Sequence, residues 1–370
     1  MVQDMSQDDI RVLVVDDSAV IRTLLCDRIG AAPGLSVAGK ARDGRDAIEK
    51  VLALRPDVIT LDLQMPGMDG LAVLDAVLNI APIPVIMVSA LTRAGATVTL
   101  DALDHGAVDY VAKPETKSSG QSGFEEELVA KIRSAVCMDV HRMMAARKRR
   151  KHVNRAVSQR PAAKPPAACP EELADKCIAL GISTGGPPAL TRLLSELRPP
   201  MPPIVIVQHM PPQFTGPLAA RLNTVSALSV REAAQGDVLQ PNGVLLAPGG
   251  IHLEVVRRGS SVKVLLHDGD VVSGHKPSVD VMMISAAKAY GPNCLGIIMT
   301  GMGRDGANGC RTIRQAGGFV LGQDESSSDV YGMNKVAFVE GNVNQQMTLS
   351  DAASSIATQV RRLGCVPTTA

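Results

Sequence analysis

The amino-acid sequence predicts two α/β domains in series, each built on a parallel β-sheet that is covered by helices on both faces. Short β-rich runs alternate with amphipathic helical segments from residue 10 to about residue 140, and a second alternation begins near Leu173. Several strand candidates, such as VITLDL, are continuously apolar, which is typical of strands buried on both faces of a sheet. A chain of 370 residues is long enough for two such domains.

The first domain is predicted to be a (βα)5 domain over residues 10–130. Its strand candidates are RVLVVD, LSVAGKA, DVITLDL, PVIMVSA and VDYVAKP. The helix candidates are SAVIRTLLCDRIG, DGRDAIEKVLAL, GLAVLDAVLNI, AGATVTLDALDHG and FEEELVAKIRSAV, each with the apolar period of an amphipathic helix. The regular alternation predicts a doubly wound sheet.

Residues 131–172 are predicted to be a helix end followed by a linker. The segment Arg142–Pro170 is basic at first and rich in Pro and Ala later, with no sustained apolar period. The basic run could instead be a nucleic-acid-binding arm, but no recognition-helix pattern stands beside it.

The second domain is predicted over residues 173–365 and resembles a Rossmann-like α/β fold. Its strand candidates are CIALGIS, PIVIVQHM, GVLLAPGG, HLEVVRR, SVKVLLHD, CLGIIMTG and GGFVLGQD. Its helix candidates are PPALTRLLSEL, FTGPLAARLN, VDVMMISAAKAY and GANGCRTIRQA. We interpret residues 241–268 as a β-hairpin insertion in this βαβ series.

Composition and charge exclude several classes of protein. The formal net charge of +1 gives no overall attraction to nucleic acid or to an anionic membrane, and the aromatic content of 2% argues against a base-stacking surface. The seven cysteines are scattered and form no CxxC pair, which favours a reducing compartment. No signal-peptide pattern or membrane-length apolar run is present. We therefore expect a cytoplasmic protein that neither binds nucleic acid nor inserts into a membrane.

Functional groups collect at the carboxyl edge of the first predicted sheet, where ligands bind in open α/β folds. Asp16 and Asp17 end the first strand, Asp62 the third, Ser89 the fourth and Lys113 the fifth. One aspartate could simply cap a helix, but three converging carboxylates repel one another unless a cation joins them. Hard oxygen ligands in a small site favour Mg²⁺.

The spacing VVDDS…LDLQMPGMDG…VSA…KP resembles a response-regulator receiver domain over nearly all of residues 10–130. The resemblance implies that Asp62 is the phosphoacceptor and that Asp16, Asp17 and Asp62 hold Mg²⁺. It further implies that Ser89 and Lys113 contact the phosphoryl group and that a histidine kinase is the donor. Tyr110 stands where the family has its rotating aromatic residue. A cis Lys113–Pro114 bond would also suit this turn.

The second domain carries the motif G-x-S-x-G over Gly181–Gly185, where a strand ends on Ser183. A glycine-rich turn before a helix also suits a bound phosphate, so the motif alone does not decide. Among the seven histidines, His209 is best placed as a base because it ends the next predicted strand. Asp305 lies in a glycine-rich loop after another buried strand and could orient that histidine.

The chain order Ser–His–Asp differs from that of the α/β-hydrolases, so the sequence does not predict that fold. The glycines around Met302 would expose backbone N–H groups, as an oxyanion hole requires. Small residues beside Ser183 would leave room for a substrate.

The segments GISTGGPPAL, VQHMPPQFT, APGG…H, HKPSVDVMM and TGMGRDGANG together resemble the chemotaxis protein-glutamate methylesterase catalytic domain. The resemblance implies a triad of Ser183, His209 and Asp305, with oxyanion contact from Met302 and support from Thr184. It implies no cofactor in the esterase site. It also implies methylated chemoreceptor helices as substrates, deamidation of specific receptor glutamines, and activation by phosphorylation.

Two other readings remain open from the residues alone. The second domain could be a nucleotide-binding or DNA-binding output, although neither G-x-G-x-x-G nor a P-loop motif is present. It could also be a non-catalytic scaffold, against which the intact Ser183, His209 and Asp305 set argues.

Overall fold

The computed structural model describes residues 9–65, 68–89, 92–113, 121–138, 140, 144 and 173–363. The chain divides into two compact units, each of which is described by itself. Most of the predicted linker, and Pro114 with the predicted cis bond before it, lie outside the described residues. The boundaries proposed for the domains therefore stay predictions.

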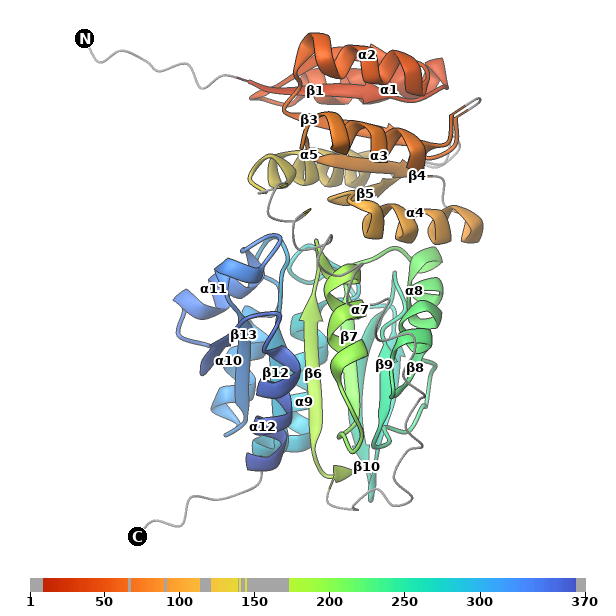
Figure 1. Cartoon of the computed structure of the whole chain (residues 1–370). Helices are drawn as coiled ribbons and strands as arrows, with labels where there is room; N and C mark the ends of the chain where they lie inside the picture. Colours follow the sequence, from red (N-terminus) through yellow and green to blue (C-terminus); the bar gives the residue numbers. More distant parts are fainter. Residues whose placement is uncertain are drawn as a thin grey trace, which may run out of the picture. The chain divides into compact units, whose positions relative to one another are not determined.

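The first unit is a five-stranded parallel sheet with strand order β2-β1-β3-β4-β5 (Figure 1). Its strands are β1 (Ile10–Val15), β2 (Leu35–Ala41), β3 (Val58–Asp62), β4 (Val85–Ser89) and β5 (Asp109–Ala112). Its helices are α1 (Ala19–Ala31), α2 (Gly44–Leu54), α3 (Gly70–Ile80), α4 (Arg93–His105) and α5 (Gln121–Val136). The predicted (βα)5 order is confirmed.

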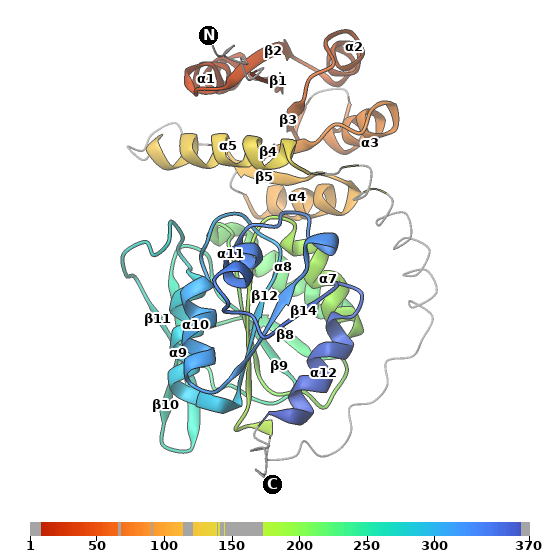
Figure 2. The ribbon, with the colours of Figure 1, turned by 90° about the vertical axis from the view of Figure 1, so that its left-hand side faces the viewer.

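Helices cover both faces of this sheet, which is why its strands are apolar throughout. The helices α2, α3 and α4 pack in sequence on one face, while α1 and α5 share the other, where Arg28 and Glu125 form an ion pair at 2.7 Å (Figure 2). Every residue of β3 and β4 is buried. The strand ends, rather than the sheet faces, are therefore the places where polar side chains can reach a ligand.

The second unit is a seven-stranded parallel sheet with strand order β14-β13-β12-β6-β7-β9-β8. Its strands are β6 (Cys177–Ile182), β7 (Ile204–Gln208), β8 (Ser229–Glu232), β9 (Gly243–Leu246), β12 (Cys294–Ile298), β13 (Phe319–Gln323) and β14 (Gln345–Met347). The central strands β12, β6 and β7 are adjacent, so their carboxyl ends bring three loops to one edge.

Helices again cover both faces of the sheet (Figure 2). One face carries α7 (Gly186–Glu196), α8 (Pro212–Val225) and α12 (Ala352–Arg362). The other carries α9 (Val279–Tyr290), α10 (Ala307–Gln315) and α11 (Met333–Val339). A separate antiparallel hairpin of β10 (His252–Arg258) and β11 (Ser261–His267) packs on α9. The doubly wound fold class is thus confirmed for both units.

The predicted insertion over residues 241–268 is correct only in its second part. The strands β10 and β11 form the expected hairpin, but β9 belongs to the main sheet, where it lies parallel to β7 and β8. The strands β8 and β14 and the helices α11 and α12 were not predicted. The strand β8 is SVRE, with only Val230 buried, so it shows no apolar run.

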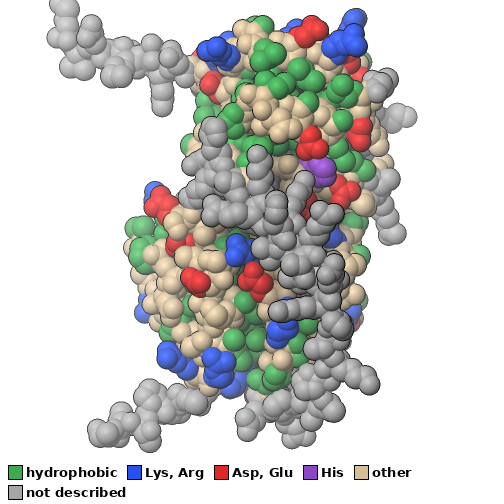
Figure 3. Space-filling view, viewed as in Figure 1, with side chains coloured by type: hydrophobic (Ala, Val, Ile, Leu, Met, Phe, Trp, Pro, Cys, Tyr) green, Lys and Arg blue, Asp and Glu red, His purple; other side chains and the backbone are tan. Residues whose placement is uncertain are grey.

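The surface carries charges of both signs. On the face drawn in Figure 3, acidic and basic side chains are scattered among neutral ones in the described part of the chain. None of the described helices is long and apolar enough to cross a membrane.

Candidate functional site

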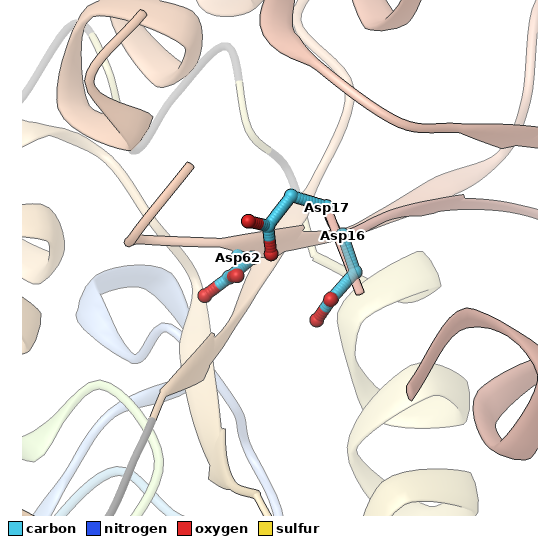
Figure 4. A group of neighbouring side chains, drawn as sticks. All are labelled: Asp16, Asp17 and Asp62. Atoms are coloured by element: carbon cyan, nitrogen blue, oxygen red, sulfur yellow. The ribbon is translucent and has the colours of Figure 1, made fainter. Parts of the chain in front are cut away.

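The acidic cluster of the first unit forms at the strand ends where the sequence predicts it. Ligand oxygens of Asp16, Asp17 and Asp62 lie within 4.8 Å of one another (Figure 4). The Lys113 ammonium lies 2.8 Å from Asp16 Oδ2 and 2.8 Å from Asp62 Oδ2. Ser89, at the end of β4, is buried, and its carbonyl accepts the Lys113 amide at 2.7 Å. All five predicted residues therefore belong to one sheet edge.

One ammonium cannot neutralise this group of carboxylates. Burial raises the pKa of the Asp62 carboxyl, and the charge of Asp16 adds to this, against the opposing hydrogen bond and charge of Lys113. Burial works to lower the pKa of Lys113, but the two partner carboxylates raise it above its ordinary value. The site thus has excess negative charge and clustered hard oxygen atoms, which fit a small divalent cation such as Mg²⁺.

Tyr110 is buried in the first unit, beneath a cationic neighbour from α5. The Lys131 ammonium lies 4.7 Å from the centre of the Tyr110 ring and donates to the Tyr110 carbonyl at 2.5 Å. Lys131 also pairs with Glu127 at 2.7 Å and Asp109 at 3.4 Å. The structure places the predicted switch aromatic inward, under this ammonium.

In the second unit, the loop after β6 carries Ser183, which is 8% exposed. Its amide donates to the Thr300 carbonyl at 2.9 Å, and its carbonyl accepts Gln208 Nε2 at 3.0 Å. Among the described non-glycine residues, Ser183 is not one of those with a positive φ, so this loop is not the strained elbow of α/β-hydrolases. The prediction that the α/β-hydrolase fold is absent agrees with this backbone.

The glycines of the serine loop are explained by internal packing. A Cβ on Gly185, whose φ is +78°, would meet the Asp329 side chain at 2.6 Å. A Cβ on Gly186 would meet Gln208 Oε1 at 1.8 Å. The space beside the serine that we expect to admit a substrate is, at these two glycines, already filled by the protein's own side chains.

His209 follows β7 and forms a direct contact with the predicted aspartate. Its Nε2 lies 2.8 Å from Asp305 Oδ2, and its side chain is 7% exposed. His209 Nδ1 is buried and has no hydrogen-bond partner among the described residues. The ring therefore turns one nitrogen to the carboxylate and keeps the other available to accept a proton.

Asp305 is fully buried and accepts three further hydrogen bonds, all from the start of α9. The donors are Ser278 Oγ at 2.8 Å, the Val279 amide at 2.7 Å and the Asp280 amide at 3.0 Å. Burial opposes its ionisation, yet the hydrogen bond and charge of His209, with these amides, hold the pKa of Asp305 below its ordinary value. The carboxylate is thus ionised and fixed in one orientation.

Met302 and Thr184 lie on the loops that flank the serine. Met302 is 38% exposed and stands between Gly301 and Gly303. A Cβ on Gly301 would meet Ser183 Cβ at 2.7 Å, so the two loops touch. The Thr184 carbonyl accepts Thr300 Oγ1 at 2.9 Å. The structure thus brings the Met302 loop against the serine loop.

Sequence reasoning assigned no role to several residues of this site. Gln208 Nε2 donates to the carbonyls of both Ser183 and His209, each at 3.0 Å. The His275 ring stacks on His209 with centroids 3.6 Å apart and an interplanar angle of 10°. The pattern PSVD, with a serine ahead of an apolar helix, could have identified Ser278 as an N-cap, and its hydroxyl accepts from the Val281 amide.

The fold and the two sites together describe a class of protein in which an α/β domain with an acidic cluster at its sheet edge precedes an α/β domain with a serine and a His–Asp pair at its own sheet edge. Residues 12–122 match the response regulator receiver domain family, and residues 178–356 match the CheB methylesterase family. The chain belongs to the CheB methylesterase family, with a response regulator receiver domain ahead of the esterase domain.

Similar proteins align with this chain along nearly their own whole length. A protein-glutamate methylesterase/protein-glutamine glutaminase of Syntrophotalea carbinolica is 44% identical over 94% of this chain and 96% of its own. A homologue of the same name, numbered 1, in Caulobacter vibrioides is 44% identical over 94% of this chain and 97% of its own. The solved CheB methylesterase catalytic domain of Thermotoga maritima is 35% identical and covers 50% of this chain and 98% of its own, with a TM-score of 0.49.

Proposed function

We propose that this protein hydrolyses γ-glutamyl methyl esters on chemoreceptors, and deamidates specific receptor glutamines, under the control of phosphorylation at Asp62. The observation that carries the proposal is the 2.8 Å contact between His209 Nε2 and Asp305 Oδ2 at the sheet edge that also bears Ser183. The names of its relatives support the same substrate class. The receptors' cytoplasmic helices are the partner surface, so the enzyme acts in the cytoplasm.

In the proposed reaction, Ser183 is the nucleophile and His209 the general base. The hydroxyl gives its proton to Nδ1, because Nε2 is engaged by Asp305. The serine oxygen attacks the ester carbonyl, and the Met302 amide stabilises the resulting oxyanion. The proton then passes to the departing methanol, which leaves a glutamyl acyl-enzyme. A water molecule activated by His209 releases the carboxylate; in deamidation, ammonia leaves instead of methanol.

Asp305 supports this chemistry in two ways: it orients the His209 ring, and its negative charge stabilises the protonated ring. Its lowered pKa keeps it ionised while the imidazole takes up a proton, so the imidazolium is stabilised without proton transfer to the carboxylate. Thr184 supports the site through its carbonyl contact with Thr300. The esterase reaction, so described, uses only groups of this chain and water.

In the receiver domain, Asp62 would accept a phosphoryl group from a histidine kinase. Asp16, Asp17 and Asp62 would hold Mg²⁺, which when bound neutralises charge on the transferring phosphoryl group. Lys113 stands 2.8 Å from Asp62 and would pair with the new phosphoryl oxygens, while the Ser89 hydroxyl would hydrogen-bond to them. Phosphorylation would favour one of two conformations of the receiver domain, and the esterase activity would depend on which conformation is populated.

Methanol release from membranes that carry methylated receptors tests the esterase proposal. We expect wild type to release methanol and Ser183→Ala to lose at least about 10³-fold of the rate, since a triad without its nucleophile retains little activity. Ser195→Ala, which removes a hydroxyl bonded only within α7, is the matched control and should keep full activity. Equal release by wild type and Ser183→Ala would refute the serine mechanism.

The same assay with acetyl phosphate and Mg²⁺ tests the switch. We expect a rate increase in wild type and none in Asp62→Asn, which should keep a slow, unstimulated activity. Asp27→Asn, an exposed aspartate of α1, is the matched control and should respond as wild type does. Undiminished stimulation of Asp62→Asn would remove Asp62 from the phosphoacceptor role while leaving the esterase proposal intact.

A further inference from the structure

The N-termini of α9 and α10 are each hydrogen-bonded to a carboxylate from the other segment: Asp305, just before α10, and Asp280, within α9. Asp305, two residues before α10, accepts the Val279 and Asp280 amides at the start of α9, at 2.7 and 3.0 Å. Asp280, in the first turn of α9, accepts the Gly306 amide at 2.9 Å and the Gly309 amide at 2.8 Å, at the start of α10. The two helix N-termini are therefore capped reciprocally.

The helix α10 depends on this arrangement because it has no cap of its own. Its N-cap residue is Gly306, which makes no side-chain cap hydrogen bond. A side chain could not be added there, since φ is +96° and a Cβ would meet Ile298 Cδ1 at 2.6 Å. The Asp280 carboxylate thus satisfies two backbone N–H groups at the start of α10, where the N-cap glycine has no side chain to do so.

A second carboxylate beside Asp305 is costly. Asp280 is 2% exposed, and burial raises the pKa of its carboxyl; the charge of Asp305 raises it further, while the Gly309 and Gly306 amides and the Ser273 hydroxyl oppose the rise. Packing of two helices does not by itself require a buried pair of like charges. This cost is explained if the Asp280 carboxylate holds in place a group that the esterase reaction needs.

We propose that Asp280 is a positioning residue of the esterase: by holding the Gly306 and Gly309 amides, its carboxylate keeps the adjacent Asp305 in reach of His209. The inference rests on the proposed triad. Gly306 directly follows Asp305, so a displaced Gly306 amide moves the carboxylate that His209 contacts at 2.8 Å. Misplacement by a fraction of an ångström weakens that contact and the base it orients.

The pH dependence of kcat/KM also tests whether Asp305 stays in contact with His209. The groups that face His209 are Asp305 at Nε2 and the His275 ring stacked on its face, with Asp280 behind Asp305. Cys310, beside Asp280, remains a neutral thiol because burial raises its pKa. If Asp305 withdraws, the imidazolium loses its stabilising charge, and the acid limb of kcat/KM moves to lower pH. His275 is present in every variant below, so its stacking on His209 is common to all of them.

The test compares Asp280→Ala with Asp280→Asn in the full-length protein. The Asn carbonyl can still accept the Gly306 and Gly309 amides, whereas Ala accepts neither. With methylated receptor membranes and methanol release, we expect Asp280→Ala to lose about 10²-fold in kcat, with KM within about 2-fold of wild type. We expect Asp280→Asn to keep most of the wild-type kcat. We also expect the acid limb of kcat/KM to move further in Asp280→Ala than in Asp280→Asn.

Ser273→Ala is the matched control, because it removes one hydrogen bond from Asp280 Oδ2 and none from the oxygen that holds α10. Rates are taken per folded molecule, at a temperature where circular dichroism shows each variant folded. Should Asp280→Ala not fold, Asp280→Ser replaces it, with an intermediate loss expected.

Three results would overturn the inference: a wild-type kcat in Asp280→Ala or its Ser replacement, equal losses in that variant and Asp280→Asn, or a lowered melting temperature with an unmoved acid limb. Ser183→Ala, assayed in the same membranes, separates this inference from the proposed function. If that variant still releases methanol, the serine mechanism fails, whatever the Asp280 variants do.

Discussion

Replacing Asp305 by asparagine should disable the base and loosen the start of α9. The carboxylate serves two donors on each oxygen: His209 Nε2 and the Val279 amide on Oδ2, and Ser278 Oγ and the Asp280 amide on Oδ1. An asparagine side chain has one acceptor oxygen and one NH₂ group. Whichever way it turns, its NH₂ group faces at least one backbone N–H, and that buried donor loses its partner.

The size of both effects can be worked from this geometry. One buried donor without a partner costs about 1–3 kcal/mol, and loss of the hydrogen bond with His209 adds to it. For a domain of this size, each kcal/mol lowers the melting temperature by about 2–4 °C. In Ser–His–Asp enzymes the Asp→Asn change lowers kcat by about 10⁴, or roughly 5 kcal/mol of transition-state stabilisation.

The assay is methanol release from methylated receptor membranes, with melting temperature measured by circular dichroism on the same preparations. Asp351→Asn is a matched control, since its carboxylate accepts a hydrogen bond only from nearby Thr348 and lies at the surface. A folded Asp305→Asn enzyme that keeps more than about a tenth of the wild-type kcat would refute the assignment of Asp305 as the orienting carboxylate.

Three further changes test other parts of the structure. Gly186→Ala should destabilise the second unit by about 1–3 kcal/mol in urea unfolding, because the new Cβ would lie 1.8 Å from Gln208 Oε1. Lys131→Met should destabilise the first unit by about 1–3 kcal/mol, since it removes the ammonium 3.4 Å from the buried Asp109 carboxylate and the donor to the Tyr110 carbonyl. Asp62→Asn should raise the melting temperature of the first unit at neutral pH. The folded-state pKa of Asp62 is raised, so ionisation costs stability as pH rises through it, and the gain should vanish below the ordinary carboxyl pKa.

The first two of these changes each have a control in the same unit. Gly216→Ala places its Cβ no closer than 3.5 Å to Glu232, so it should be neutral or slightly stabilising. Lys50→Met removes a partly exposed ion pair with Asp46 and should cost less than about 1 kcal/mol. A stability gain in Asp62→Asn that is independent of pH would contradict the linkage argument, and an innocuous Gly186→Ala would contradict the packing argument.

The sequence predicted the strand ends well because parallel strands bring their carboxyl ends to one edge. That rule alone placed Asp16, Asp62 and Lys113 together, and likewise His209 with Asp305. The strand β14, QQM, was not predicted because it is short and polar, and sheet pairing rather than hydrophobicity sets its conformation.

The supporting residues could not be predicted for a different reason. Gln208 and Asp280 act on backbone groups of loops that are distant in the chain: Gln208 reaches Ser183, 25 residues away, and Asp280 reaches Gly306, 26 residues away. No local pattern encodes such partners. Likewise the glycines beside Ser183 indicated room for a substrate in the sequence, whereas at Gly185 and Gly186 the side chains of Asp329 and Gln208 fill the space.

The close packing at the glycines around Ser183 bears on the proposed switch. A Cβ on Gly181 would meet Val279 Cγ1 at 2.2 Å, and a Cβ on Gly301 would meet Ser183 Cβ at 2.7 Å. A loop wedged in this way between its neighbours resists deformation, because close-packed interiors have few intermediate arrangements. Under the proposed switch, we therefore expect phosphorylation to change the access of receptor helices to Ser183, while the serine loop keeps the same conformation in the resting and the stimulated enzyme.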